Sequence, residues 1–245
     1  MNSYIKKLVN ALDLRTMPLS LSGVLLGSLL AVADFHVSWM VVLAVCLAAA
    51  SLHVYQSGAN KLALIPSVLF AVAAVCCSFG KIFILESLLM LLFAYFIMRL
   101  ASGTIVRGRG RLADGLILCF LTGPVAVYGT YFLCSHTFGS WVLLFPALSI
   151  GTLCVAASGL KDGYSKSAVT FITLAGLALM SVFPFLRIHD PAHFRFVIMI
   201  PIYIMYLVMM HKDKSRTTDT FMPLFAFCLL ALAAITGLGF VSYLF

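Results

Sequence analysis

Most charged side chains of this chain are basic, and they gather in short polar breaks between long apolar runs. The chain has 16 Lys and Arg residues against 8 Asp and Glu residues, and only 10% of its 245 residues are charged. Lysine and arginine hold phosphate oxygens through charge-assisted hydrogen bonds. One hypothesis is therefore that a cluster of them at one membrane face holds phosphate or pyrophosphate. The alternative, that they are anchors that set membrane orientation and contact anionic lipid, stays open.

The candidate substrate-binding residues stand in or beside these breaks; the basic ones are candidates because of their charge, and the others because of the family resemblance described below. They are Arg15, Tyr55, Gln56, Asn60, Lys61, Arg107, Arg109, Arg111, Ser158, Lys161, Asp162 and Lys166. No catalytic residue and no metal site is assigned, because Asp162 is the only acid of the set and a hard cation needs several oxygen ligands. His53 is interpreted as an interfacial side chain rather than as a metal ligand.

Nine apolar runs must position these residues. Hydrophobic residues make up 63% of the chain, and about 20 apolar residues cross a bilayer as a helix. Continuous apolar runs, without period-two alternation, favour helices over a barrel. We expect an all-α, multi-pass membrane protein with a single domain over residues 1–245. The runs lie near 17–34, 38–56, 62–79, 83–103, 114–134, 140–159, 167–186, 194–210 and 220–244.

The distribution of Lys and Arg among the connections predicts the orientation. If the N-terminus is cytoplasmic, the connections after the second, fourth, sixth and eighth runs are cytoplasmic too, and these carry most of the basic residues. The expected topology has nine spans in the cell inner (plasma) membrane, with the C-terminus outside. Because the basic residues lie in short connections between spans, the net charge of +8 does not indicate nucleic-acid binding. Membrane lipid is the expected partner, and the oligomeric state stays open.

A short internal similarity divides the chain into two halves of four runs, plus a ninth. Residues 46–51 read C-L-A-A-A-S and residues 154–158 read C-V-A-A-S, and both end a run. Because both ends should face the cytoplasm, the predicted repeat is parallel. Small residues such as Gly23, Gly27, Gly123 and Gly129 predict close helix packing. Pro124, inside the fifth run, predicts a helix irregularity.

Three segments carry a family resemblance. They are residues 14–23 (L-R-T-M-P-L-S-L-S-G), 123–133 (G-P-V-A-V-Y-G-T-Y-F-L) and 158–163 (S-G-L-K-D-G). With the nine runs in order, they resemble the UbiA-type intramembrane prenyltransferases, most closely the 1,4-dihydroxy-2-naphthoate polyprenyltransferases of menaquinone synthesis. The resemblance implies a helical bundle around a cavity open to the cytoplasmic leaflet. It also implies two Asp-rich motifs, at the ends of spans two and six, that hold Mg²⁺ against the pyrophosphate of a polyprenyl donor.

The chain departs from both Asp-rich motifs. In the first, which reads N-D-Y-x-D-Y-x-x-G-x-D in the family, Tyr55 and Gly58 match, whereas Ser51, Val54 and Asn60 replace the aspartates. In the second, which reads N-N-L-R-D-x-x-x-D, Asp162 is retained and Lys166 stands at the last position. Mg²⁺ needs carboxylate ligands, so we expect weak or absent Mg²⁺-dependent transfer.

The expected function is that of a UbiA-type prenyltransferase-like membrane protein that accepts an isoprenoid, a polyprenyl pyrophosphate or a quinone-like lipid. Mg²⁺ would be its cofactor only if the family's activity is retained. Two alternatives stay open: a non-catalytic protein that binds isoprenoid lipid or partners an active enzyme, and a small transporter. The motifs also predict that the ends of the second and sixth runs meet, with Tyr55, Gln56 and Asn60 near Ser158, Lys161 and Asp162.

Overall fold

The computed structural model describes residues 17–35, 37–56, 61–77, 111–159, 163–187, 196–212 and 221–241. These residues form helices and contain no strand. The elements are α2 (Met17–Phe35), α3 (Trp39–Gln56), η1 (Lys61–Ala63), α4 (Leu64–Cys77), α6 (Arg111–Phe120), η3 (Leu121–Val125), α7 (Ala126–Ser135), η4 (Trp141–Leu143), α8 (Leu144–Gly159), α9 (Lys166–Arg187), α10 (Ile200–Lys212) and α11 (Phe221–Val241).

The helices coincide with the predicted apolar runs, which confirms the all-α fold class. Eight runs correspond to helices, and seven of them agree at both ends within about three residues; the run near 194–210 corresponds to α10, which begins later, at Ile200. The run near 83–103 lies outside the described residues, so the number of spans stays a prediction. Within the described ranges, four helices are long and apolar enough to cross a membrane: Met17–Phe35, Gly115–Ser135, Trp141–Gly159 and Lys166–Leu186. The 19 residues of α2 extend about 28 Å, close to the thickness of a bilayer core. The chain is a multi-pass membrane protein.

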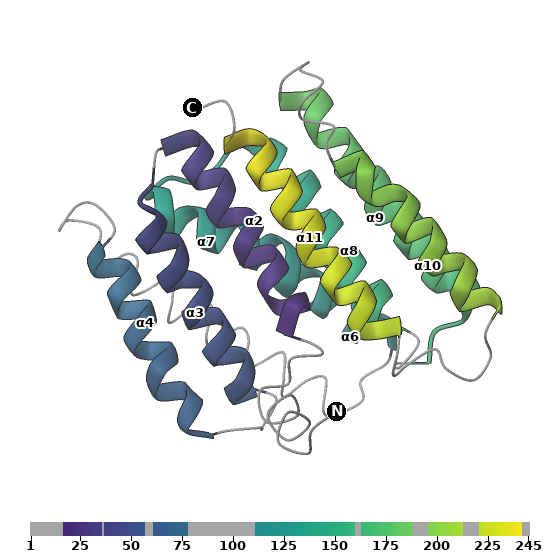
Figure 1. The fold of residues 1–245 in the computed structure, drawn as a ribbon, viewed down its shortest axis with the longest axis horizontal. Coiled ribbons are helices and arrows are strands. Elements are labelled where there is room, and N and C mark those ends of the chain that lie inside the picture. The colour runs from purple at the N-terminus through teal and green to yellow at the C-terminus, as the bar shows by residue number, and fades with distance from the viewer. Residues whose placement is uncertain are drawn as a thin grey trace.

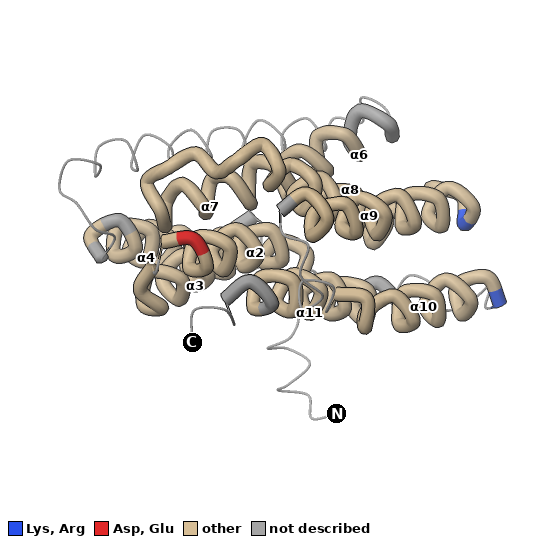
Figure 2. Tube along the Cα trace, turned by 90° about the horizontal axis from the view of Figure 1, so that it is seen from above, with Lys and Arg blue, Asp and Glu red and all other residues tan. Residues whose placement is uncertain are grey.

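The described helices form two layers (Figures 1 and 2). One layer holds α4, α3, α2, α11 and α10 in that order, and the other holds α7, α6, α8 and α9. About two-thirds of the apolar length of α2 and of the helix Trp141–Gly159 is buried inside the bundle, against about one-third for the helix Gly115–Ser135. These two helices are therefore the centre of the bundle. Outward-facing side chains such as Met40, Leu69 and Phe171 are exposed and apolar, as lipid contact requires.

Three close approaches show that α2 and the η3–α7 helix run parallel. A Cβ atom on Gly23 would meet the carbonyl oxygen of Thr122, and one on Gly27 would meet that of Val127. Near the other end, the Tyr131 hydroxyl donates a hydrogen bond of 2.6 Å to the carboxylate of Asp34. Residue numbers therefore increase together along both helices. This parallel course of the first helix of each half agrees with the predicted parallel repeat.

The fifth-run helix contains one π-helical turn, η3, at the predicted proline. Pro124 has no N–H, and its ring would clash with the carbonyl of the preceding turn. The hydrogen-bond register shifts, so that the Ala126 N–H reaches the carbonyl oxygen of Leu121. One turn earlier, the Thr122 hydroxyl donates to the carbonyl oxygen of Leu118 at 2.7 Å. These bonds satisfy backbone groups that have no water to bind in the bilayer core.

Candidate functional site

The first turn of α2 joins the ends of α3 and α8. A hydrogen bond of 2.7 Å links the Ser20 hydroxyl to Nδ1 of His53, in the last turn of α3. One residue earlier, the Leu19 carbonyl oxygen accepts a 3.5 Å hydrogen bond from the Cys154 thiol of α8. The start of α2 therefore lies against the last turn of the second run and against Cys154 of the sixth run, four residues before the second motif-like segment begins.

The segment that resembles the family's fifth span packs into the same centre. A Cβ atom on Gly123 would meet the carbonyl oxygen of Ala147, and one on Gly151 would meet that of Cys119. These close approaches lock the η3 turn against α8, while Gly23 places α2 against Thr122. We call this set of contacts the glycine junction; it consists of Gly23, Gly123 and Gly151. It fixes α2, η3 and α8 relative to one another.

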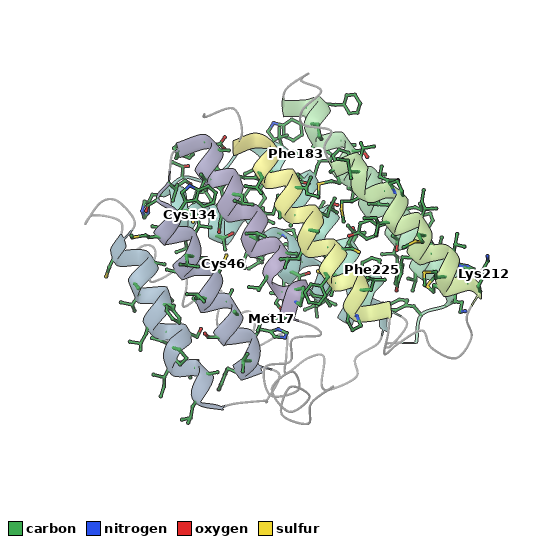
Figure 3. The ribbon with its side chains drawn as sticks, in the orientation of Figure 1. Met17, Cys46, Cys134, Phe183, Lys212 and Phe225 are labelled. Carbon is green, nitrogen blue, oxygen red and sulfur yellow. The ribbon has the colours of Figure 1, made fainter. Side chains whose placement is uncertain are left out.

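Several described basic residues stand at helix ends on one side of the bundle. Lys61 precedes α4, Arg111 begins α6, Lys166 begins α9 and Lys212 ends α10. In Figure 3, Met17 and Lys212 lie at the lower ends of α2 and α10, whereas Phe183 lies toward the upper end of α9. We call this lower side of the bundle the basic end. Arg187 ends α9 on the opposite side.

Three of these cations are not placed to stabilise their own helices. Lys61, Arg111 and Lys166 stand at helix N-termini, where the macrodipole disfavours positive charge by about 0.3–1 kcal/mol each. Lys166 also reaches across to α10, where its ammonium donates a hydrogen bond to the carbonyl oxygen of Met210. That contact supplies positive charge to the C-terminal end of α10 and ties it to the start of α9.

The described candidate residues all fall at the basic end. Tyr55 is half-buried in the last turn of α3, which Gln56 ends; Ser158, near the end of α8, donates to the Val155 carbonyl at 3.4 Å. Lys61, Arg111 and Lys166 begin their elements, as given above. The remaining candidates lie outside the described residues, so the predicted meeting of side chains from the two motifs stays a prediction. They are Arg15, Asn60, Arg107, Arg109, Lys161 and Asp162.

The donor atoms at the described ends of α3 and α8 do not fit Mg²⁺. They are the imidazole of His53, the phenol of Tyr55, the hydroxyl of Ser158 and the thiol of Cys154. Mg²⁺ prefers carboxylate and water oxygens, and these described ends carry no carboxylate. Across all described residues, no three His, Cys, Asp or Glu side chains come together as metal ligands. The described groups suit an anion or a polar head group better than a divalent cation.

Two contacts could not be foreseen from the sequence. Ser20 attracts attention there only as a small residue, and His53 only as an interfacial one; their hydrogen bond depends on the packing of α2 against α3. The bond between Asp34 and Tyr131 lies at the opposite end, where the Phe35 ring meets the Tyr131 ring edge-on with centroids 6.1 Å apart. In both cases the available signal was only that the two residues were expected near the same membrane face.

The fold and this site define the class of protein as a helical, multi-pass membrane protein whose central helices meet at a basic end. No family model, curated protein or solved structure matches the chain.

Proposed function

We propose that this chain is a UbiA-type membrane protein that binds a polyprenyl pyrophosphate at its basic end, with weak or absent Mg²⁺-dependent prenyl transfer. The observation that carries the proposal is the packing around the first turn of α2. Ser20 contacts His53, which lies in the stretch aligned with the first Asp-rich motif. Leu19 contacts Cys154, four residues before the segment 158–163. The 123–133 segment packs against the same helix through Thr130 and Val127. Residues 123–133, His53 and a residue close to 158–163 in the sequence thus adjoin one helix, α2.

Electrostatics supports an anionic ligand at this end. The helices α2, α4, α6, α9 and α11 begin there, whereas α3, α8 and α10 end there. Among the described helices, positive dipole ends therefore outnumber negative ones, and each contributes a partial charge of roughly half a unit. Cations at the starts of α4, α6 and α9 add to this field at a cost to their own helices. A pyrophosphate is a ligand whose charge offsets that cost.

The replaced aspartates are the reason to expect little transfer. Magnesium-assisted loss of pyrophosphate needs the metal to neutralise charge that develops on the leaving group. Lys166 stands where the family has an acid, and its fixed positive charge repels Mg²⁺ while attracting phosphate. If the protein binds the donor without ionising it, it is a non-catalytic lipid-binding protein or the partner of an active enzyme rather than an active prenyltransferase.

The test is an assay of prenyl transfer to 1,4-dihydroxy-2-naphthoate by the purified protein in lipid, with and without Mg²⁺, beside an active family enzyme. Binding of polyprenyl pyrophosphate is measured on the same preparations. We expect binding, with turnover at least about 100-fold below that of the enzyme, equivalent to roughly 2.7 kcal/mol of lost transition-state stabilisation. Robust Mg²⁺-dependent turnover would overturn the proposal of a silent site.

The orientation is part of the proposal: the basic end faces the cytoplasm. A reporter that is active only in the cytoplasm should therefore be active when fused after Lys212, at the basic end, and silent when fused after Ser135, at the opposite end. The same pair of fusions made with a reporter active only outside should give the reverse pattern. Activity of the cytoplasmic reporter at Ser135 would invert the proposed orientation and remove the pyrophosphate site from the cytoplasmic leaflet.

A further inference from the structure

Among the described residues, the buried hydroxyl of Tyr203 has no hydrogen-bond partner. Tyr203, in the first turn of α10, is 1% exposed. Its hydroxyl oxygen is inaccessible to solvent and finds no hydrogen-bond partner among the described residues. A phenol normally keeps a partner when it is buried, and a buried donor without one costs about 1–3 kcal/mol. Phenylalanine would fill nearly the same space without that cost, so the hydroxyl calls for an explanation other than packing.

The surroundings of this hydroxyl are apolar. The Tyr203 ring meets the ring of Phe225, on α11, edge-on with centroids 5.1 Å apart. The thiols of Cys228 and Cys154 act on it electrostatically, and thiols are weak hydrogen-bonding groups. A buried water needs two to four polar partners, and thiols are poor ones. An apolar molecule that carries a single strong acceptor suits the place better.

We propose that Tyr203 is the polar anchor of a lipid site between α10, α11 and α8, where its hydroxyl donates to the carbonyl oxygen of an apolar ligand. A quinone carbonyl and a phospholipid ester carbonyl share this chemistry. The choice of a quinone as ligand rests on the proposed function. The observation that the Tyr203 hydroxyl has no partner among the described residues does not depend on that function. Figure 3 shows Phe225 on α11, the helix that would form one wall.

Two features of the packing around Tyr203 are compatible with a ligand. Helix α10 packs less closely on α9 and α11 than α11 packs on α2. The same buried cluster contains Met180, Met199 and Met210, whose flexible thioether side chains adapt to irregular space. Met199 precedes Tyr203 by one helical turn, on the side toward which a helical side chain leans.

The test compares Tyr203→Phe with Tyr206→Phe. Tyr206 is the matched control because it lies one turn further along α10, is 3% exposed and packs on the same Phe225 ring at 4.7 Å. Binding of a 1,4-naphthoquinone with a short isoprenoid tail is measured in an ester-free detergent. We expect Tyr203→Phe to weaken it about five- to tenfold, as the loss of one hydrogen bond does, and Tyr206→Phe to leave it unchanged. Without ligand, Tyr203→Phe should raise the melting temperature by about 2–4 °C.

A second arm replaces the quinone by phospholipid. Melting temperatures of wild type and Tyr203→Phe are compared in nanodiscs of diacyl and of diether lipids, which differ in the ester carbonyl. If only wild type is more stable in the diacyl lipid, the carbonyl comes from a phospholipid. If neither quinone nor ester carbonyl distinguishes wild type from Tyr203→Phe, the inference is overturned. Polyprenyl pyrophosphate binding, measured in parallel, tests the proposed function separately, since Tyr203→Phe should not change it.

Discussion

Gly123→Ala should destabilise the protein by at least about 2 kcal/mol, the range in which overpacking of a tight interior falls. The added methyl group would meet the carbonyl oxygen of Ala147 and lie 3.0 Å from the nitrogen of Gly151, both backbone atoms of α8. Backbone atoms of a central helix cannot rotate away as a side chain can, so α8 and the η3 turn must separate. Because Gly23 joins the same η3 segment to α2, we expect the whole glycine junction to loosen.

Gly129→Ala is the matched control. Gly129 belongs to the continuation of the same helix, but a Cβ atom there meets nothing within 4 Å. Alanine is the better helix former by up to about 1 kcal/mol, so this variant should be as stable as wild type or more so. Chemical or thermal unfolding in one detergent, with both variants side by side, measures the difference. Equal stability of the two variants would show that η3 and α8 do not approach as closely as the structure has them.

These two glycines also show how far the fold could be predicted from sequence. The apolar runs predicted the helices because bilayer thickness and backbone hydrogen bonding together fix their type and length. Close helix packing was predicted for Gly123 and Gly129 alike, since their neighbours in the sequence do not distinguish them. Only the packing of η3 against α8 separates a glycine that must be small from one with open space beside it. Likewise, Pro124 predicted an irregularity, but the π-helical turn is set by which carbonyls find new donors.

The candidate site was predictable in location and less so in contacts. The excess of Lys and Arg at the connections pointed to one end of the bundle because charged side chains are excluded from the bilayer core. The individual partners depend on tertiary packing. Lys166 was predicted as an anion ligand from its place in a motif. In the structure its ammonium donates a hydrogen bond to the Met210 carbonyl oxygen of α10. That hydrogen bond to a neutral group leaves the positive charge in place, so its effect on an anion can still be measured.

The double variant Lys161→Ala, Lys166→Ala should weaken polyprenyl pyrophosphate binding about 100-fold or more. Two charge-assisted hydrogen bonds are removed, each worth roughly 1.5–3 kcal/mol, and the field at the basic end falls by two unit charges. Isothermal titration or a fluorescent-analogue competition, in neutral lipid at fixed ionic strength, measures the change. Raising the salt concentration should weaken wild-type binding more than binding to the variant, because surface charge is screened within about 8–10 Å.

Two controls separate this result from a loss of net charge or of folding. Arg187→Ala, Arg195→Ala removes the same two charges around the connection that follows α9, away from the basic end, and should leave binding within about twofold, since Coulomb attraction weakens with distance and screening. Lys166→Arg keeps the charge and a donor for Met210 and should bind nearly as wild type does. If Lys161→Ala, Lys166→Ala folds, as judged by its melting curve, yet binds the ligand unchanged, the basic end is an orientation signal alone. Anionic-lipid contact would then account for its lysines and arginines, because the positive-inside rule requires no ligand at all.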